Sequence, residues 1–575
     1  MPKGRLLFLF TSLLTIPVFS QTNYPQNYFG PPLNNTLSLV GNFGEIRPNH
    51  FHAGFDIRTG GQEGLTVNAI ADGYVSRVKI GSDGYGKAIY INHPNGYTSV
   101  YGHLQGFSKE ITTFARKIQY AKETFEIDTI LSPDLLPVKK GQQIALSGNT
   151  GSSSGPHLHF EIRTTKTEMP VNLYCFGYKI PDNTEPKIVE LAVIPMDKAA
   201  TVNGKHALRK IKPVFKSGRY SIVAADSITV NGEIGFGINC YDTESGSTNH
   251  NGVYSIELQA GGKRIYYHQL ETFSFENSRY VNAHIVYPEK EKHNEIIQKC
   301  YLSKNDKLEI YKDVTSHGII NFKDDSVHYI GYIVKDFVGN TSEVYLKVKS
   351  TSKAGIVNSR ETIKPEHFDC LSENVSETDE YKISIPANAL YDDIDFVKSV
   401  TLGVKAPYAP LIGLSPNDIA FQKEYKLSIK AMMLHDSLQK KACIISYSGK
   451  GKIEYEGGEY KDGWVLAGVK HFGNFTIGID NTPPSISLNN KVQDKNNIDL
   501  SKAKTIGITS TDNLSGIKKY RATIDGRWVL CEYEPKKELL YYTFDGSIKS
   551  GEHTFKIEVT DDKNNTSRLT FKFKR

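Results

Sequence analysis

The sequence predicts an all-β chain built from several antiparallel β-sheet units, and three observations support this fold class. The 575 residues include 33 Tyr and 27 Phe, and aromatic residues fit the half-buried faces of strands. Short apolar runs alternate with Gly, Asn and Asp turns along most of the chain, which is the pattern of hairpins and β-sandwiches. The hydrophobic fraction of 39% and charged fraction of 23% exclude wholesale disorder and a polytopic membrane protein.

The length of the chain indicates its number of domains, and its net charge indicates which partners it suits. At roughly 150 residues per domain, the chain should hold about three to five domains. The net charge of +6 suits an anionic wall or membrane surface, but for a chain of this length it gives no argument for nucleic acid.

The first 20 residues are predicted to form a cleaved signal peptide. Lys3 and Arg5 precede an apolar run from Leu6 to Leu14, and Ser20-Gln21 offers a cleavage site. The run is too short to span a bilayer comfortably, which favours cleavage over an uncleaved anchor. We therefore expect an exported protein, periplasmic or extracellular at the cell envelope, with no transmembrane segment after cleavage.

The six cysteines are dispersed and form no CxxC motif, which excludes a Cys-type zinc site and a disulfide-dense scaffold. Buried free thiols and unidentified bridges both remain open. The residues are Cys175, Cys240, Cys300, Cys370, Cys443 and Cys531.

Two hairpins are predicted in the first third of the chain. Residues 67–70 and 74–78 flank Asp72-Gly73, a strong tight-turn signal. Residues 87–92 and 97–101 flank a second turn near Asn95-Gly96. Residues 108–137 then interrupt the β pattern, and we interpret them as an insertion with a short helix near 114–120 before a strand near 142–146.

Beyond about residue 185 the pattern is that of β-sandwich (Ig-like) modules with an internal repeat. Residues 238–246 resemble 508–516, and 336–342 resemble 561–567. We therefore predict related Ig-like sandwiches at 185–352 and 483–575, a β-rich module at 353–482 between them, and linkers near Ser350–Lys353 and Asn481–Pro484.

Acidic turn residues of the repeats could indicate Ca²⁺, but they lack EF-hand spacing, and turn chemistry by itself explains Asp at such positions. We favour that structural interpretation. The residues are Asp242, Asp336, Asp512 and Asp561.

Three histidine-bearing segments carry the chemistry. His157 and His159 are two apart, so on a strand both point to one face, while Leu158 and Phe160 point into a core. His52 and Asp56 would share a face if they lay on one strand, and His103 ends the second predicted hairpin. Imidazole and carboxylate are good Zn²⁺ ligands, and three of them leave a coordination position for water, as metal-assisted hydrolysis requires.

Three other residues near these segments receive minor roles. His50 should be a supporting or groove residue, and His93 should lie on the surface of a hairpin turn. Glu161 shares the His159 face and would either hydrogen-bond a ligand or be a plain surface charge.

Taken together, these segments resemble the lysostaphin/LytM-type zinc metallo-endopeptidases over about residues 40–175. The motifs are Phe43-Gly44-Glu45-Ile46-Arg47, His52-Ala53-Gly54-Phe55-Asp56, Tyr101-Gly102-His103-Leu104, and Gly148-Asn149-Thr150-Gly151 running on to Gly155-Pro156-His157-Leu158-His159-Phe160-Glu161. The whole arrangement, an exported peptidase followed by β modules, also resembles multidomain members from Bacteroidota-type bacteria.

The resemblance implies a zinc endopeptidase domain at 21–184 on an antiparallel β scaffold. It implies His52, Asp56 and His159 as Zn²⁺ ligands and His157 as general base. His103 would orient water or stabilise the oxyanion. The implied substrates are the peptide stems and cross-links of peptidoglycan, but the insertion at 108–137 is a departure, and because such loops rim the substrate groove in the family, cross-link specificity is not carried over.

Two other functions stay open. The chain could be a non-catalytic envelope-binding or scaffolding protein, since about two-thirds of it is β modules that could bind an envelope protein partner. It could also be a zinc protease acting on protein substrates. The presence of all five candidate residues favours an enzyme over a binding module, and the choice between peptidoglycan and protein substrates stays open.

Overall fold

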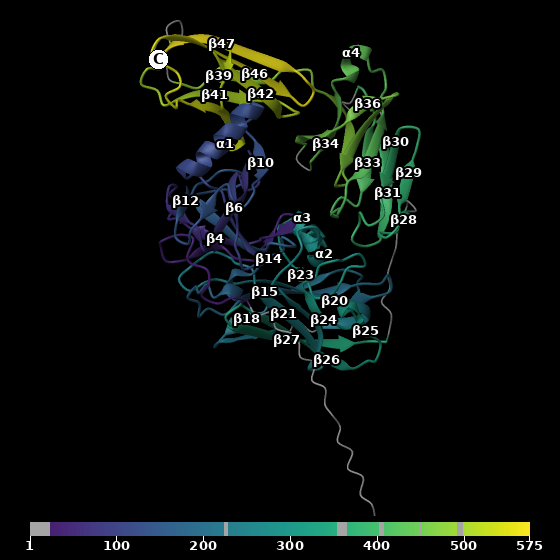
Figure 1. Cartoon of the computed structure of the whole chain (residues 1–575). Coiled ribbons are helices and arrows are strands. Elements are labelled where there is room, and N and C mark those ends of the chain that lie inside the picture. Colours follow the sequence, from purple (N-terminus) through teal and green to yellow (C-terminus); the bar gives the residue numbers. More distant parts are fainter. Residues whose placement is uncertain (1–23, 224–227, 353–364, 402–406, 449–450, 491–497) are drawn as a thin grey trace, which may run out of the picture.

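The computed structural model describes residues 24–223, 228–352, 365–401, 407–448, 451–490 and 498–575. Most of the regular structure consists of strands. They form an N-terminal unit and three β modules, each with its own hydrophobic core (Figure 1). We refer to residues 24–184 as the N-terminal unit, and to 185–352, 365–482 and 483–575 as the first, second and third modules. The predicted signal peptide at 1–20 lies outside the described residues, and the exact domain boundaries stay a prediction.

The N-terminal unit contains a nine-stranded antiparallel sheet, whose main path runs β1-β4-β13-β8-β7-β6-β10, and a three-stranded sheet of order β5-β12-β9. Its strands are β1 (Leu39–Gly41), β2 (Ile46–Arg47), β3 (His50–Phe51), β4 (Phe55–Arg58), β5 (Thr66–Asn68), β6 (Gly73–Ile80), β7 (Lys87–Asn92), β8 (Tyr97–Gly102), β9 (Gly106–Phe107), β10 (Ile127–Ile130), β11 (Pro137–Val138), β12 (Gln143–Leu146), β13 (His157–Thr164) and β14 (Pro170–Val171).

One of the two predicted hairpins is confirmed and the other is wrong. β7 and β8 pair antiparallel around the Asn95-Gly96 turn, as predicted. β5 does not pair with β6. It pairs instead with β12, from more than 70 residues later, while β6 pairs with β7, β10 and β11. The local pattern located the strands and the turn, but the partner of β5 was a distant strand that the pattern could not indicate.

The predicted insertion contains a helix, α1 (Lys109–Lys122), longer than the segment 114–120 expected from the sequence. Ile111, Ala115 and Gln119 recur every four residues and bury one helix face. The helix ends at Glu123, which adopts the left-handed conformation. Another side of the helix contacts the third module, where the Tyr120 and Trp528 rings lie edge to face with their centroids 5.0 Å apart.

The first module is an eleven-stranded sheet system around a separate core. Its strands are β15 (Lys187–Pro195), β16 (Thr201–Val202), β17 (Arg209–Ile211), β18 (Val214–Lys216), β19 (Arg219–Ser221), β20 (Ile228–Tyr241), β21 (Ser255–Ala260), β22 (Lys263–Gln269), β23 (Gln298–Lys299), β24 (Tyr311–Val314), β25 (Ile320–Phe322), β26 (Val327–Lys335) and β27 (Thr341–Ser350). β18 and β19 pair only with each other.

A segment of the first module completes the core of the N-terminal unit. It carries α2 (Val281–His284) and α3 (Tyr287–His293) between β22 and β23. The Phe273 ring lies 5.2 Å from Phe43 and 5.5 Å from Phe51, between ring centroids. Because Phe273 and Val281 are fully buried in the same cluster as the N-terminal strands, the N-terminal unit and the first module share hydrophobic packing.

The second module places a six-stranded and a five-stranded antiparallel sheet around one core. Its elements are β28 (Glu366–Phe368), β29 (Asn374–Glu377), β30 (Tyr381–Ile385), β31 (Ile394–Thr401), β32 (Leu411–Ser415), β33 (Tyr425–Lys430), α4 (Asp436–Gln439), β34 (Ala442–Tyr447), β35 (Ile453–Gly457), β36 (Glu459–Lys461), β37 (Trp464–Val469) and β38 (Asn474–Ile479).

The third module places a four-stranded and a five-stranded sheet around its own core. Its strands are β39 (Ser485–Leu488), β40 (Ile498–Asp499), β41 (Thr505–Thr511), β42 (Ile517–Ile524), β43 (Arg527–Trp528), β44 (Cys531–Glu534), β45 (Leu539–Thr543), β46 (Glu552–Asp561) and β47 (Thr566–Lys574).

The two repeated segments occupy corresponding places in the first and third modules. Residues 238–246 and 508–516 run off the ends of β20 and β41, and 336–342 and 561–567 form the turns of the hairpins β26–β27 and β46–β47. Each module also has one parallel pairing with its last strand, β20 with β27 and β40 with β47. The predicted all-β, antiparallel fold class is therefore confirmed, whereas the Ig-like assignment stays a prediction.

The chain folds back so that the third module contacts the N-terminal unit beside α1 (Figure 1). Lys87 forms an ion pair with Glu532 at 2.6 Å, and Arg521 forms one with Glu123 at 2.6 Å. All six cysteines lie in described ranges and are free thiols, five of them buried. Within the described residues, none of the helices is long and apolar enough to cross a membrane.

Candidate functional site

A cavity of about 920 Å³ in the N-terminal unit holds the candidate residues. His52, Asp56, His103, His157 and His159 all line it. Three basic side chains, Arg47, Arg58 and Lys79, also line it, and Asp56 is the one carboxylate in the lining. None of residues 108–137, all of which the structure describes, lines this cavity, so the insertion does not rim it as the family resemblance implied.

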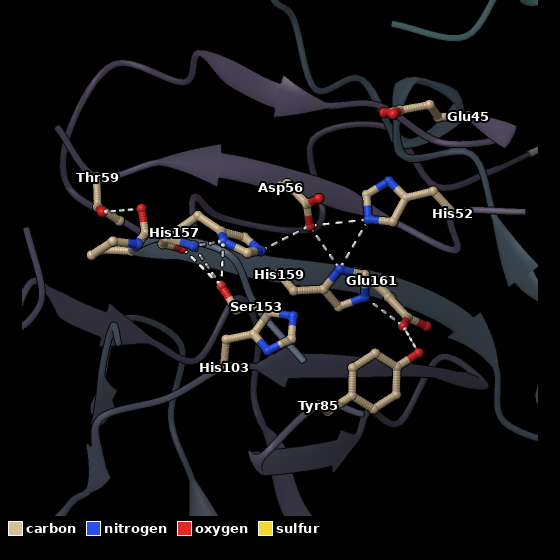
Figure 2. A network of polar contacts seen from close by, with 12 residues as sticks. Glu45, His52, Asp56, Thr59, Tyr85, His103, Ser153, His157, His159 and Glu161 are labelled. Atoms are coloured by element: carbon tan, nitrogen blue, oxygen red, sulfur yellow. Dashed lines mark hydrogen bonds and ion pairs between the residues drawn. The ribbon is translucent and has the colours of Figure 1, made fainter. Parts of the chain in front are cut away.

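At the centre, two imidazoles and one carboxylate converge (Figure 2). The His52 Nε2 atom lies 3.0 Å from Asp56 Oδ1 and 3.0 Å from His159 Nδ1, and His159 Nδ1 lies 2.9 Å from Asp56 Oδ1. In a tetrahedral zinc site with bonds near 2.0 Å, ligand atoms lie about 3.3 Å apart. This nearly equilateral triangle is therefore only slightly tighter than a zinc site, and the three residues could hold a metal ion.

Strand register brings the three residues together. In β13, His157, His159 and Glu161 alternate with the fully buried Leu158 and Phe160, as the two-residue period predicts. β13 pairs with β4 so that His159 lies directly opposite Asp56. The strand argument for His52 and Asp56 was wrong, because His52 lies between β3 and β4 rather than on one strand with Asp56. Their convergence depends on the turn at 52–54.

Each imidazole of the triangle donates a hydrogen bond from its other ring nitrogen. The His52 Nδ1 atom lies 2.7 Å from the carbonyl oxygen of Asn42, and His159 Nε2 lies 2.7 Å from Glu161 Oε1. A carbonyl oxygen only accepts, so His52 must carry its hydrogen on Nδ1, which leaves the Nε2 lone pair facing Asp56. Such partners orient metal-binding histidines and fix their tautomers.

The histidines around Asp56 keep this carboxylate ionised. Burial by itself would raise the pKa of Asp56, but the surrounding imidazoles of His52, His157 and His159 outweigh it and hold the pKa well below its usual range. Arg47 Nη2 also donates to Asp56 Oδ2 at 3.2 Å. An ionised oxygen facing two imidazole nitrogens is a suitable third donor for a divalent metal.

Behind His159 lies a buried polar network. Glu161 is fully buried and accepts hydrogen bonds from His159, Tyr85 and, at 2.6 Å, Arg163 Nε. Burial would raise the pKa of Glu161, but Arg163 and His159 hold it below its usual range. The Tyr85 ring also stacks on His159 at 5.0 Å. Glu161 is thus a supporting residue, the first of the two interpretations that the sequence left open.

Sequence reasoning missed Arg163, Tyr85 and Asn42. Arg163 continues the two-residue series of β13 through 157, 159 and 161, so the same period would have found it. Tyr85 and Asn42 carry no local signal, because their positions depend on pairing between distant segments.

His157 and His103 flank the triangle. His157 Nε2 lies 3.3 Å from Asp56 Oδ1, and its Nδ1 donates to the carbonyl oxygen of Gly155 at 2.8 Å. His103 Nδ1 donates to the carbonyl oxygen of Thr150 at 2.8 Å, and the rings of His103 and His157 lie 4.8 Å apart. With its one hydrogen on Nδ1, each neutral imidazole therefore carries its lone pair on Nε2, and the Nε2 atom of His157 lies beside Asp56. Burial, together with His159 and His157, lowers the pKa of His103 to about 3, so it is neutral.

Two other histidine predictions have different outcomes. His50 is exposed, lines the cavity and lies outside the triangle, which agrees with a groove position. His93 was predicted on the surface, but it is 5% exposed. Its Nδ1 lies 2.9 Å from the Asp72 carbonyl oxygen and its Nε2 lies 2.8 Å from Ser99 Oγ. It is a satisfied core residue between two strands.

The third module fastens the loop that leads into His157. Lys536, in a short 3₁₀ helix (Pro535–Lys537), donates from Nζ to the carbonyl oxygens of Asn149 and Ser153, both at 2.7 Å. Ser153 Oγ in turn lies 3.2 Å from His157 Nδ1. A residue from the far module therefore helps to position this loop.

Replacing Glu161 with Gln tests the support behind His159. The variant keeps the shape of the side chain but removes the carboxylate charge that accepts the hydrogen bond from His159 Nε2. We therefore expect zinc affinity to fall about 10- to 100-fold. Competition with a zinc-sensitive chelating dye measures it. Glu168→Gln, at an exposed turn position beyond the same strand, is the control. Equal affinity in both variants would show that Glu161 does not support the ligand.

Two family models match the chain. The model of Peptidase family M23 matches residues 50–119 and 134–173, and the model of the Zu5-like domain matches residues 365–480. The first match contains all five candidate residues, and the second coincides with the predicted β-rich module.

The curated relatives that match the chain include two bacterial cell-wall proteins, each over a part of its length. The DD-carboxypeptidase/endopeptidase Mpg of Neisseria meningitidis serogroup B is 31% identical over 168 residues, which are 29% of this chain and 30% of that protein. The murein hydrolase activator NlpD of Escherichia coli K12 is 36% identical over 110 residues, 19% of this chain and 22% of that protein. The chain thus spans less than a third of either relative.

Among solved structures, the catalytic domain of the antimicrobial peptidase lysostaphin from Staphylococcus simulans is 23% identical. The match covers 25% of this chain and 92% of that one, with a TM-score of 0.19, which is too low to bear on function. The N-terminal unit therefore carries an M23 peptidase domain, on the strength of the family model and the curated relatives.

Proposed function

We propose that this chain, with its M23 peptidase domain, is an exported zinc metallo-endopeptidase that hydrolyses amide bonds in the peptide cross-links of peptidoglycan. One observation carries the proposal. Two imidazole nitrogens and a carboxylate oxygen lie within 3.0 Å of one another, and two further histidines in the same cavity hold their ring hydrogen on Nδ1.

The residues fit a catalytic zinc site. His52 Nε2, His159 Nδ1 and Asp56 Oδ1 supply three ligands of the types that catalytic zinc takes. When bound, zinc supplies a Lewis acid that polarises the scissile carbonyl and lowers the pKa of water.

His157 is placed to act as general base. Because its Nδ1 hydrogen is held by the Gly155 carbonyl oxygen, its Nε2 can take the proton from an attacking water at the edge of the triangle. The imidazolium that forms can then give this proton to the leaving amine, so one residue serves both steps.

His103 is better suited to orienting water than to stabilising an oxyanion. It is neutral and its one ring hydrogen is bound to the Thr150 carbonyl oxygen. A neutral Nε2 accepts a hydrogen bond but does not donate one, so it can hold a water and cannot neutralise negative charge. This favours the first of the two roles that the resemblance implied.

The cavity charge fits peptide stems at the cell envelope. Three basic side chains line the cavity, those of Arg47, Arg58 and Lys79. The one carboxylate in the lining, Asp56, is itself a proposed metal ligand. A positive lining attracts substrates that carry free carboxylates. Nucleic acid has no support as a partner, and the β modules could bind an envelope protein.

The decisive experiment is mass spectrometry of purified muropeptides after incubation with the zinc-loaded chain. We expect cross-linked dimers to be converted to monomers with the mass of one added water, and a zinc chelator to stop the conversion. Intact dimers after prolonged incubation would contradict the proposal. Digestion of Gly-rich peptides in parallel distinguishes a protease that acts on protein substrates.

The second candidate is a non-catalytic envelope protein, and the relative that is named a murein hydrolase activator is the observation that favours it. In that case the chain would stimulate a separate hydrolase without cleaving muropeptides itself. The presence of all five candidate residues in one cavity weighs against it, because a binding module has no need of them.

A further inference from the structure

The acidic turn residues of the first module converge on one point. One carboxylate oxygen from each of Asp182, Asp242 and Asp336 lies within 4.8 Å of the others. Two oxygens on opposite sides of a Ca²⁺ ion, each bound at about 2.4 Å, are about 4.8 Å apart. Asp242 and Asp336 are 5% and 4% exposed, and Asp182 is half-buried. Buried like charges at this spacing repel one another, and either a proton or a cation relieves the repulsion.

The second observation is a pair of buried oxygens with no hydrogen-bond partner. Asp242 Oδ1 is one of them, and Oδ1 of Asn251 is the other, in a side chain that is only 3% exposed. Asp242 and Asn251 exchange both backbone hydrogen bonds, at 2.9 and 2.8 Å. Residues paired in this way project their side chains on the same face, so the neutral amide of Asn251 lies on the face of Asp242. Unsatisfied buried oxygens are costly and call for a partner.

Asp336 accepts hydrogen bonds from the Gly339 and Asn340 backbone N–H groups, whereas the charge of Asp242 has little compensation. Burial raises the pKa of Asp242 to about 7, and Asp182, Asp336 and Glu244 act in the same direction. The other acidic clusters differ. Lys304 lies 3.3 Å from Asp369 and 2.8 Å from Asp393, and Lys563 interacts with Asp480 in the cluster of the third module.

The cluster of the third module is the repeat counterpart of the first. Asp480, Asp512 and Asp561 converge in the same manner, and Asp512 Oδ1 is again a buried oxygen without a partner. Asp182 and Asp480 each open a D-N-T-x-P sequence directly before the first strand of their module. The arrangement is therefore built twice, with Lys563 in the second copy at the position that Val338 occupies in the first.

We infer that Asp182, Asp242 and Asp336, with Asn251, form a Ca²⁺ site that ties the end of the N-terminal unit to the first module. All its donors are hard oxygens, which suit Ca²⁺ rather than zinc. The site lies at the base of the loop 243–250, which docks on the N-terminal unit. Glu244 accepts from the Leu39 backbone N–H at 3.2 Å, and Asn249 donates to the Leu39 carbonyl oxygen at 3.2 Å.

Calcium binding by the full chain tests this inference. The chain is freed of metals, reloaded with zinc and titrated with CaCl₂ in equilibrium dialysis. We expect Asp242→Asn to bind one calcium fewer than the natural chain, with the dissociation constant of the lost site on the order of 10⁻⁴ to 10⁻³ M or tighter. Asp512→Asn, the matched change in the third module, should keep that site. Equal calcium binding by Asp242→Asn and the natural chain would overturn the inference.

Thermal unfolding distinguishes the loss of a calcium site from misfolding of the variant. Without calcium, Asp242→Asn should unfold at or above the temperature of the natural chain, because a repelling charge is gone. Calcium should raise the unfolding temperature of the natural chain and leave that of Asp242→Asn unchanged. A calcium-dependent rise of the same size in both would contradict the site. Zinc content, measured on the same samples, keeps this result separate from the proposed hydrolase activity.

Discussion

His159→Ala should lose both zinc and hydrolysis, and this is the largest effect that we expect. The imidazole supplies one of three metal ligands through Nδ1 and is fixed from behind by Glu161. Without it, two ligands remain, which is too few for a catalytic zinc site. We expect no zinc in the purified protein by elemental analysis, and muropeptide cleavage at least about 10³-fold slower, because the Lewis acid is lost.

His50→Ala is the matched control, since His50 lines the same cavity outside the triangle. It should keep its zinc and most of its activity. Cleavage by His159→Ala at the rate of the natural chain would eliminate the metal mechanism, and a loss of zinc in His50→Ala would mean that the ligand set is wrongly assigned.

His157→Ala should separate metal binding from catalysis. His157 Nε2 approaches Asp56 Oδ1 at 3.3 Å but is not part of the tight triangle. We therefore expect zinc content to stay near that of the natural chain while the rate of cleavage falls about 10²- to 10⁴-fold, the usual contribution of a general base. Paired measurements of zinc content and single-turnover cleavage check this.

Two outcomes would refute the role given to His157. Unchanged cleavage would remove it as the base, and a loss of zinc would make it a ligand instead. His103→Ala provides the comparison, because a residue that only orients water should cost less than the base does.

The site was largely predictable because its signals are local. The two-residue period of β13 places His157, His159 and Glu161 on one face, whatever the rest of the fold does. His52 and Asp56 converged for a different reason from the one predicted, since the turn between β3 and β4, rather than a single strand, brings them together.

Two errors involve partners that the local pattern does not specify. β5 pairs with β12 instead of β6, and His93 is buried with hydrogen-bond contacts to Asp72, 21 residues earlier, and to Ser99 on the next strand. The helix in the insertion was found, but its contact with Trp528 in the third module was not. A local pattern reports which face of a segment is buried, and it carries no information about which segment covers that face.

The contact between Lys536 and the carbonyl oxygen of Ser153 spans 383 residues. At 5 to 20 residues per second, a ribosome needs roughly 20 to 80 seconds to add that length of chain. The strands that carry His52, Asp56 and His159 are therefore synthesised well before the lysine that fastens the loop beside His157. In a newly made chain these three residues are therefore present for an interval before Lys536 can hold the loop. The order of synthesis itself delays completion of the site.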